Sequence, residues 1–288
     1  MGHRFTYVVS PEEERENLTV EWFLRRHGYS RHIITGLKRT EDGIFRNGVR
    51  AGDVIETHLV ETEPSDGILP RPVPFSVVYE DDDILVVDKP ADTPIHPSIG
   101  NYENTLANGI AWYFEQKGEP FVYRCINRLD RDTTGLIVLA KHALSAAVLS
   151  QAMRSREIHR TYQAFALGET AASGTIDAPI ARLNGSLIQR TVDFASGERS
   201  VTHYRTLAHC SVFSHLELNL ETGRTHQIRV HMAYIGHPLL GDTLYNKTPG
   251  TFPRQALHSA SLSFVHPITG EPLNFHAPLP EDMQNLLT

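Results

Sequence analysis

A proline-rich segment divides the chain and limits what it can fold into. Residues 63–74, EPSDGILPRPVP, contain four prolines. Such a segment can continue neither a helix nor a central strand. We therefore expect a linker at 63–74 between a small N-terminal unit, residues 1–62, and a larger unit, residues 75–288. This division fits a chain of 288 residues, because a typical domain has about 100 to 200 residues.

The composition is that of a folded protein with a sizeable core. Hydrophobic residues make up 40% of the chain and charged residues 21%. The longest fully apolar run, Leu136 to Ala140, is far shorter than the roughly 18 residues of a membrane span. The two cysteines, Cys125 and Cys210, lack the spacing of a zinc site, and the first residues do not form a secretory signal. We therefore expect a cytoplasmic protein without a membrane partner.

The net charge of −7 is distributed unevenly along the chain. Residues 61–92 contain nine acids and two bases, so this segment alone accounts for the net charge. Residues 19–50 and residues 124–160 each contain seven bases and three acids. Two locally basic patches are therefore present. Each is either a solvated face or a surface for an anionic polymer such as RNA.

The N-terminal unit shows patterns for short elements of both kinds. Residues 18–27 have apolar side chains at helical spacing and predict a helix that ends at Gly28. Ser30 can cap a second amphipathic helix. GIFRNGV (43–49) and GDVIETHLVE (52–61) are bounded by turn residues and predict two strands.

The larger unit alternates strand and helix patterns. Strands joined largely by hairpins, with helices interspersed, predict an α+β fold with a mainly antiparallel mixed sheet and flanking helices. The expected elements are a hairpin at 77–90, a helix at 104–117, a strand at 136–141, a helix at 143–154, a strand at 160–168, mostly extended chain at 174–220 and a helix at 224–236.

Several common chemistries lack their motifs. The chain contains no GxxxxGK[S/T], GxGxxG or GxSxG sequence, so we expect no nucleotide cofactor and no hydrolase elbow. His226 and His231 are five residues apart. That spacing separates them by about 140° around a helix, so they cannot share one metal ion without distortion. We expect neither a metal nor an organic cofactor, and these histidines can instead cap, stack or contact phosphate.

The most informative segment is YRCINRLDRDTTGLIVLAK, residues 123–141. Asp130 lies before a turn and a buried strand, with Arg128 and Arg131 as neighbours. A carboxylate beside guanidinium groups stays ionised and can act as a nucleophile or a base. The same pattern is also compatible with a structural, salt-bridged aspartate. Asp132 is expected to cap the turn.

Within this segment, INRLDRDTTGLIVLAK resembles the central motif of the RluA-type pseudouridine synthases, whose usual form is HRLDxxTSG followed by an apolar strand. Asn127 stands where His is commoner, and Thr134 replaces the usual Ser; both keep hydrogen-bonding capacity. The resemblance covers roughly residues 75–280. Three further segments match in order: ILVVDKPADTPIHPS, HRTYQAFALG and LETGRTHQIRVHMAYIGHPLLGD.

The N-terminal unit is similar to the alpha-L RNA-binding domain that many members of this family carry. Its stretch between NGV and RAGD is shorter than the usual pattern. The resemblance implies a small α+β module that adds affinity for RNA. Its bases would then contact phosphate, namely Arg25, Arg26, Arg31 and Lys38.

The resemblance implies a pseudouridine synthase fold and an isomerase that detaches uracil from a uridine in RNA, rotates it and rejoins it through C5. The position of the family's catalytic aspartate falls on Asp130. Tyr162 matches the active-site tyrosine, and Arg229 matches the arginine that pairs with the carboxylate. Without the resemblance, these two would be interpreted as a half-buried strand tyrosine and a surface charge.

A base in folded RNA must be flipped out before it can react, and Arg128 matches the residue expected to assist. The resemblance gives further RNA contacts at His96, Arg131, Thr134 and His226. The expected partner is ribosomal RNA, most simply 23S RNA, with transfer RNA as the other possibility, and we expect a monomer. An alternative is a non-catalytic RNA-binding protein or RNA chaperone that retains the fold.

Overall fold

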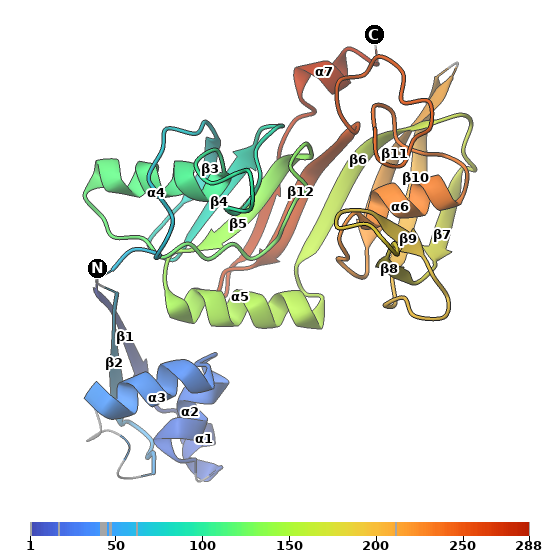
Figure 1. Cartoon of the computed structure of the whole chain (residues 1–288). Coiled ribbons are helices and arrows are strands. Elements are labelled where there is room, and N and C mark those ends of the chain that lie inside the picture. Colours follow the sequence, from blue (N-terminus) through green and yellow to red (C-terminus); the bar gives the residue numbers. More distant parts are fainter. Residues whose placement is uncertain are drawn as a thin grey trace.

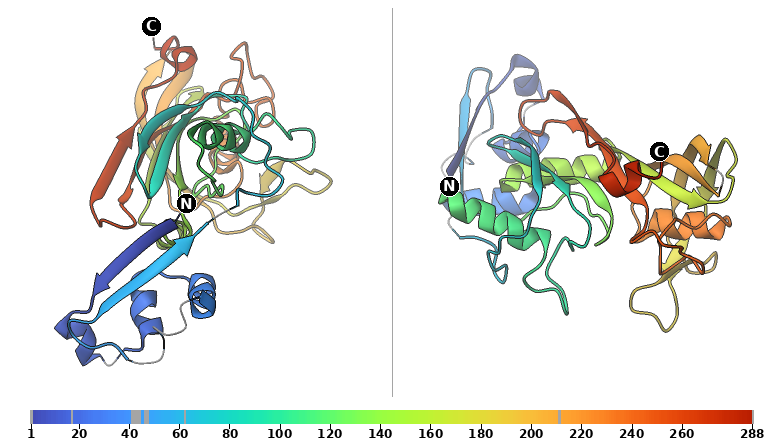
Figure 2. Two further views of the ribbon diagram at one scale, coloured as in Figure 1. Left: turned by 90° about the vertical axis from the view of Figure 1, so that its left-hand side faces the viewer. Right: turned by 90° about the horizontal axis from the view of Figure 1, so that it is seen from above.

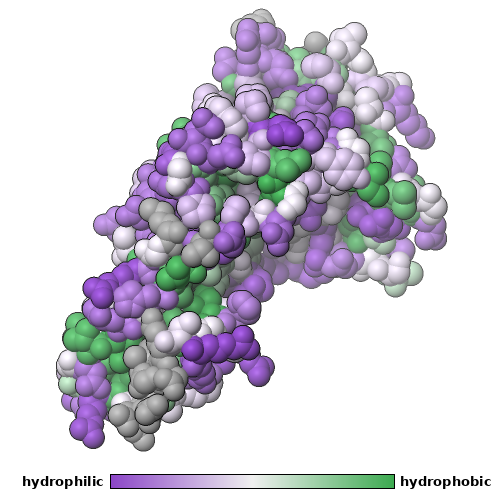
Figure 3. All heavy atoms as spheres, turned by 60° about the vertical axis from the view of Figure 1, so that its left-hand side comes forward, coloured by the Kyte–Doolittle hydropathy of each residue, from purple (hydrophilic) through white to green (hydrophobic). Residues whose placement is uncertain are grey.

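The protein is described here by a computed structural model, which places residues 2–16, 18–40, 45, 48–61, 63–210 and 212–287. Two units are visible in Figures 1 and 2: a small one that contains the N-terminus, and a large one built on a long, twisted sheet. Within the described residues, no helix is both long and apolar enough to cross a membrane. On the face shown in Figure 3, hydrophilic side chains cover most of the surface.

The large sheet has the order β3-β4-β5-β12-β6-β11-β10-β7, and β13 pairs with β12 beside this path. Every neighbouring pair is antiparallel except β5 and β12, which are parallel. The predicted α+β class with a mainly antiparallel mixed sheet is therefore confirmed. The strands are β3 (Ser76–Glu80), β4 (Ile84–Lys89), β5 (Thr134–Ala140), β6 (His159–Leu167), β7 (Ser173–Asp177), β10 (Val201–Cys210), β11 (Phe213–Leu220), β12 (Leu257–Val265) and β13 (Pro272–His276).

Both faces of the sheet centre are buried, which explains the continuous apolar runs in the sequence. Successive side chains of a strand point to opposite faces. Leu85 of β4 and Ile137 of β5 therefore face one core, while Ile84 and Leu136 face the other. Strands buried on two sides have no polar face, so they lack the alternation seen in half-exposed strands.

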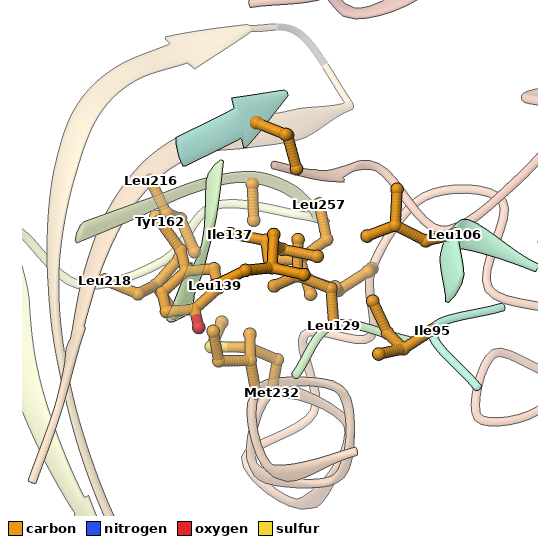
Figure 4. Packing of buried hydrophobic residues seen from close by; sticks show 14 of the residues in the cluster. Ile95, Leu106, Leu129, Ile137, Leu139, Tyr162, Leu216, Leu218, Met232 and Leu257 are labelled. Carbon is orange, nitrogen blue, oxygen red and sulfur yellow. The ribbon is translucent and has the colours of Figure 1, made fainter. Parts of the chain in front are cut away.

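Helices cover both faces of this sheet. The helices α4 (Leu106–Lys117) and α6 (Gln227–Tyr234) pack on one face, and α5 (Ala143–Ser155) packs on the other. In Figure 4, Met232 extends from α6 toward Leu139 and Tyr162. A short helix, α7 (Glu281–Gln284), and a two-stranded sheet of β8 (Ile180–Arg182) and β9 (Arg190–Val192) complete the large unit.

The elements of the small unit are β1 (Gly2–Val8), α1 (Pro11–Arg15), α2 (Val20–Arg26), α3 (Arg31–Thr40) and β2 (Val54–Val60). The unit packs the helices α2 and α3 against a two-stranded ribbon, and the short helix α1, without buried residues, precedes them. The Ser30 hydroxyl accepts a hydrogen bond from the Ile33 N–H at 3.3 Å, so the predicted cap of α3 is present.

The small sheet pairs β2 with a strand at the N-terminus, β1, in register from Gly2 with Val60 to Val8 with Val54. The strand predicted at 43–49 lies largely outside the described residues, because 41–44, 46 and 47 are not described. The sequence analysis did not predict β1, whose alternate residues are only half buried.

The small unit is fixed to the large one through α5. Leu144 of α5 is fully buried in the same apolar cluster as Phe23 and Leu24 of α2. The Glu61 carboxylate also receives a two-pronged ion pair from Arg124, with Oε1–Nη2 at 2.6 Å and Oε2–Nη1 at 2.9 Å. Apolar burial and a bidentate ion pair together hold the two units in one arrangement.

The predicted linker contains no helix or strand among its described residues, 63–74. It is nevertheless bound to the large unit. The Asn108 side chain donates to the Leu69 carbonyl at 2.7 Å, and the Arg71 N–H donates to the Asn108 carbonyl at 3.1 Å. The Tyr123 N–H donates to the Ser65 hydroxyl at 2.8 Å. These hydrogen bonds hold the segment in place against the large unit.

A glycine at the contact between the units leads to a stability prediction. Gly28 has φ of +86°, and a Cβ on it would lie 2.4 Å from Val148 Cγ2. Gly28→Ala therefore combines backbone strain with a clash, and we expect a loss of about 1–3 kcal/mol in the free energy of unfolding. Denaturant unfolding of the purified variant measures this.

Val148→Ala is the matched background for that measurement. Because the shorter side chain removes the clash but not the strain, Gly28→Ala should cost less in this background than in the native chain. Equal costs in the two backgrounds would show that Gly28 does not contact Val148.

Candidate active site

The loop that carries Asp130 is bonded to the strand that follows it. Asn127 is buried; its Nδ2 donates to the Leu136 carbonyl at 3.1 Å, and its Oδ1 accepts from the Val138 N–H at 2.9 Å. The Thr133 N–H donates to the Asp130 carbonyl at 3.1 Å and closes the turn. Asp130 is therefore held at the entrance to β5, and the amide of Asn127 satisfies both strand groups.

Asp130 forms an ion pair with Arg229, which lies 99 residues away in the sequence. Arg229 Nη1 is 2.9 Å from Asp130 Oδ2. The same guanidinium binds Asp242 with two further hydrogen bonds, Nε to Oδ2 at 2.7 Å and Nη2 to Oδ1 at 2.9 Å. The structure thus brings together the aspartate and the arginine that the sequence analysis singled out, and adds a second carboxylate behind them.

The charge of Arg229 is secured by its two carboxylate partners. Only 7% of Arg229 is exposed. Burial alone would lower its pKa, but the hydrogen bonds to Asp242 and the charge of Asp130 outweigh burial and raise it. Arg229 therefore remains a cation, and its Nη1 holds the Asp130 carboxylate in place.

Asp242 is a site residue that the sequence analysis missed. Its side chain is fully buried, and its Oδ1 also accepts the N–H groups of Leu244 and Tyr245 at 3.0 and 3.2 Å. The carboxylate therefore orients Arg229 and closes the turn after α6 at the same time. The available signal was the end of the motif segment, LLGD, which places an acid shortly after the helix.

Asp130 and Arg229 line a cleft of about 790 Å³ together with Tyr162. Tyr162 lies on β6 and is 4% exposed. Its ring packs beside Leu216 and Leu218 of β11, as Figure 4 shows. A rigid ring at the cleft wall offers a surface on which a planar base can stack.

His226 is a neutral group beside the aspartate. It also lines the cleft, with its Nε2 3.9 Å from Asp130 Oδ1 and its Nδ1 2.8 Å from the Tyr245 hydroxyl. Burial lowers the pKa of His226; Arg229 lowers it further, while Asp130 acts in the opposite direction. At neutral pH this histidine is therefore a hydrogen-bonding group and not a cation.

The cleft is more basic than the protein as a whole. The Asp130 and Glu221 carboxylates line it, and the arginines outnumber them. The exposed Arg128, expected to assist base flipping, lies on this wall. The arginines are Arg128, Arg154, Arg156, Arg160, Arg224 and Arg229.

Three of the RNA contacts predicted in the large unit do not line the cleft: His96, Arg131 and Thr134. His96 packs edge-on against Tyr123 at 5.2 Å between ring centroids. Arg131 is exposed and forms ion pairs with Asp132 at 3.2 Å and Asp92 at 3.5 Å. Asp132 was expected to cap the turn, but its carboxylate binds Arg131 instead.

Thr134 lies in the sheet. It is 6% exposed, and its hydroxyl lies 2.8 Å from His258 Nδ1 between the parallel strands β5 and β12. Its hydroxyl is therefore engaged within the sheet, outside the cleft lining, and its contact with RNA stays a prediction.

Three of the four bases predicted to bind RNA in the small unit already have acidic partners. Arg25 and Lys38 both bind Glu21, at 2.9 and 2.6 Å, and Arg26 binds Glu16. Arg31 is exposed at the start of α3. These pairs lower the effective positive charge of α2 and α3.

Lys89 is a second residue that the sequence analysis missed, although it lies in the quoted segment ILVVDKPADTPIHPS. It is fully buried and donates to the carbonyls of Pro90 and Arg131 at 2.7 and 2.8 Å. The second bond ties β4 to the loop that carries Asp130. Burial lowers the pKa of Lys89 to about 7, although the charges of Asp132 and Asp130 oppose this.

Among the described residues, one group has the composition of a metal site: Asp81, Asp83 and His266. It does not line the cleft. The backbone N–H groups of Ile268 and Thr269 donate to His266 Nδ1, so Nε2 carries the proton that Asp81 accepts at 3.0 Å. The group is therefore a closed hydrogen-bond network.

Comparison with known proteins identifies the family. Residues 83–234 match the profile of the family described as RNA pseudouridylate synthase. A Bacillus subtilis protein named uncharacterized RNA pseudouridine synthase YjbO is 39% identical over 279 residues, which cover 94% of this chain and 98% of the relative. The ribosomal large subunit pseudouridine synthase D of Vibrio cholerae is 42% identical over 254 residues, 83% and 77% of the two chains.

Solved structures show the same fold. Human RNA pseudouridylate synthase domain containing 1 superposes with a TM-score of 0.60 at 26% identity, covering 75% of this chain and 86% of the other. The human domain containing 4 protein superposes with a TM-score of 0.61 at 22% identity, covering 74% and 91%. The chain belongs to the RNA pseudouridylate synthase family, in its RluA-type branch, and is an RNA pseudouridine synthase.

Removing the charge behind Arg229 should damage stability and turnover together. Asp242→Asn leaves the guanidinium with one anionic partner, so we expect a loss of about 3–5 kcal/mol in unfolding free energy and a strong loss of pseudouridine formation. Asp193→Asn is the matched control, because Asp193 also accepts two backbone N–H groups in a turn but does not line the cleft. Equal effects of the two substitutions would contradict a special role for Asp242.

The lowered pKa of Lys89 predicts a pH dependence of stability. Between about pH 7 and pH 10 the unfolded chain binds a proton at this lysine and the folded chain does not, so stability rises with pH. Relative to Lys89→Met, the native protein should gain up to about 1.4 kcal/mol per pH unit in this range. Urea unfolding at several pH values measures the difference.

Lys117→Met is the control for that measurement. Burial opposes the charged form of Lys117, but hydrogen bonding to Glu80 raises its pKa above the ordinary value. Both states of the chain then keep this proton over the same range, so no gain with pH is expected. A gain equal to that at Lys89 would show that the pH dependence comes from other groups.

Proposed function

We propose that this enzyme converts uridine to pseudouridine in large-subunit ribosomal RNA, with Asp130 as the catalytic carboxylate. The observation that carries the proposal is the ion pair of Asp130 with Arg229, 2.9 Å long, in the wall of a cleft that Tyr162 also lines. An ionised carboxylate, a fixed cation and an aromatic surface in one cleft are the groups that glycosidic cleavage and base rotation require.

The reaction is an isomerisation and needs no other reactant. The N1–C1′ bond of the uridine breaks, uracil turns within the cleft, and a C5–C1′ bond forms; the proton lost from C5 is balanced by the one gained at N1. Asp130 serves either by attacking C1′ or by accepting a proton, and both routes require its ionised form. Arg229 places its cation against the carboxylate and fixes its orientation in the cleft.

The remaining cleft residues serve the base and its surroundings in this proposal. Tyr162 stacks on the displaced uracil, and His226, neutral and 3.9 Å from Asp130, offers a hydrogen bond beside it. Arg128 is exposed at the cleft and fills the space from which the base is flipped. His96 and Arg131 lie outside the cleft lining and would contact RNA further from the target.

The substrate class rests on the relatives and on charge. Relatives at 41–42% identity are named for the ribosomal large subunit. The excess of arginines in the cleft suits a polyanion. We further propose that the small unit, residues 1–62, is an RNA-binding module that adds modest affinity, through Arg31 more than through Arg25, Arg26 and Lys38, whose acidic partners are already in place.

The charge of Asp130 provides the direct test. Asp130→Asn keeps the size of the side chain and removes its charge, so pseudouridine formation in an unmodified large-subunit RNA transcript should fall by at least about 100-fold. RNA binding should change little, because phosphate contacts supply most of the affinity. Asp132→Asn is the matched control, since that neighbouring carboxylate does not line the cleft and its loss should leave turnover near normal.

Mapping pseudouridines in total RNA from cells with and without the gene then identifies the target. Sites missing only from large-subunit RNA support the proposal, whereas sites missing only from transfer RNA contradict the substrate class. An Asp130→Asn protein with near-normal turnover would contradict the catalytic assignment. RNA binding with no missing site at all would favour the RNA-chaperone alternative.

A further inference from the structure

Arg160 is a cleft residue with no role in the site described so far. It lies on β6 two positions before Tyr162. Alternate residues of a strand point to the same face, and both side chains line the cleft. Along the strand they are separated by about 6.7 Å.

The guanidinium of Arg160 lacks the partners that neighbouring arginines have. Its Nε is buried, and no described residue accepts a hydrogen bond from it. Arg156 and Arg224, on the same cleft, form ion pairs with Glu221 and Glu198 at 3.3 and 2.5 Å. Leaving a buried donor unpaired costs about 1–3 kcal/mol or more when it is charged. Such a group is a candidate for a functional contact.

The surroundings of Arg160 leave its terminal nitrogens open. They lie beside Gly223, where a Cβ would be 3.5 Å from both Nη1 and Nη2. The loop that contains this glycine is held by Gln227, whose Oε1 accepts from the Thr222 hydroxyl at 2.8 Å and the Arg224 N–H at 3.0 Å. A fixed loop without a side chain at this point keeps space in front of the guanidinium.

The partner that fits this geometry is an anion with several oxygens. A guanidinium presents its donors as a planar fork that matches a phosphate. The nearby Glu221 carboxylate cannot take this place, because Arg156, Arg199 and His203 already bind it. The substrate proposed above carries its negative charge on phosphates alone.

We propose that Arg160 is a phosphate-binding subsite, which holds an RNA backbone phosphate next to the uridine whose base stacks on Tyr162. This inference rests on the proposed function, since it takes RNA as the occupant. The phosphate accepts hydrogen bonds from the terminal nitrogens Nη1 and Nη2 of Arg160. The backbone on one side of the base is thereby fixed while the base itself is free to turn.

Binding measurements test the subsite separately from turnover. With an unmodified large-subunit RNA transcript, Arg160→Gln should weaken binding by about tenfold or more. It should also reduce the slope of log affinity against log salt by about 0.7 to 0.9, the contribution of one phosphate. Arg160→Lys should restore the slope but only part of the affinity, because it keeps the charge and loses the fork.

Neutral phosphates identify the contact itself. The test uses a synthetic RNA hairpin that the native protein binds, with one phosphate at a time replaced by a neutral methylphosphonate. One of these replacements should strongly reduce the affinity of the native protein and leave the affinity of Arg160→Gln unchanged. Arg205→Gln is the matched control, since Arg205 is on β10, pairs with Glu217 at 2.9 Å and does not line the cleft. It should respond to every substitution as the native protein does.

Stability separates a binding role from a structural one. Because no described residue accepts a hydrogen bond from Arg160 Nε, Arg160→Gln should leave the melting temperature unchanged or higher. A lower melting temperature with an unchanged salt slope would overturn the subsite and make Arg160 a structural residue. An Arg160→Gln protein as sensitive as the native one to every neutral phosphate would also overturn it. Failure of the native protein to form pseudouridine would instead refute the proposed function, because the binding results do not depend on turnover.

Discussion

The chain of charges from Asp130 through Arg229 to Asp242 is the interaction on which the site depends. It joins three segments: the loop before β5, the helix α6, and the turn after that helix. Burying the charges of Arg229 and Asp242 is costly unless each finds a partner with good geometry. Asp242 accepts hydrogen bonds from Nε and Nη2 of Arg229, and the remaining Nη1 binds Asp130 at the cleft. Asp242 thus fixes the position of Arg229, and Arg229 in turn orients the Asp130 carboxylate.

The sheet places this chain of charges beside the aromatic wall. The strands β5 and β12 pair in parallel at the centre, and β6 lies on the other side of β12. The entrance to β5, which holds Asp130, therefore lies across the cleft from Tyr162 and Arg160 on β6. Lys89 strengthens the same region, because its buried amine binds the carbonyl of Arg131 in the Asp130 loop. The sheet and α6 fix the positions of Tyr162 and Arg229, and the loop before β5 carries Asp130.

Many strands and helices could be predicted from sequence patterns, and the features that were missed have physical causes. The runs of β4 and β5 were predictable because both their faces are buried. The strand β1 was missed because it lies in a two-stranded ribbon with only half-buried residues, where the apolar signal is weak. Thr134 was expected at the RNA and is buried in the sheet. Side-chain direction depends on which strand packs alongside, and no local pattern encodes that.

The sequence by itself determined the α+β class and the motif segments that carry Asp130, Tyr162 and Arg229, and it predicted a division at the prolines. These features arise from local chemistry: backbone restriction by proline, the period of apolar residues, and residue types at fixed spacing. Only the tertiary structure decided that Asp242 binds the far side of Arg229 and that Arg160 Nε finds no acceptor among the residues that the structure describes. Pairing and burial are relations between segments far apart in the chain. They exist only once the hydrophobic cores have packed the strands and helices together.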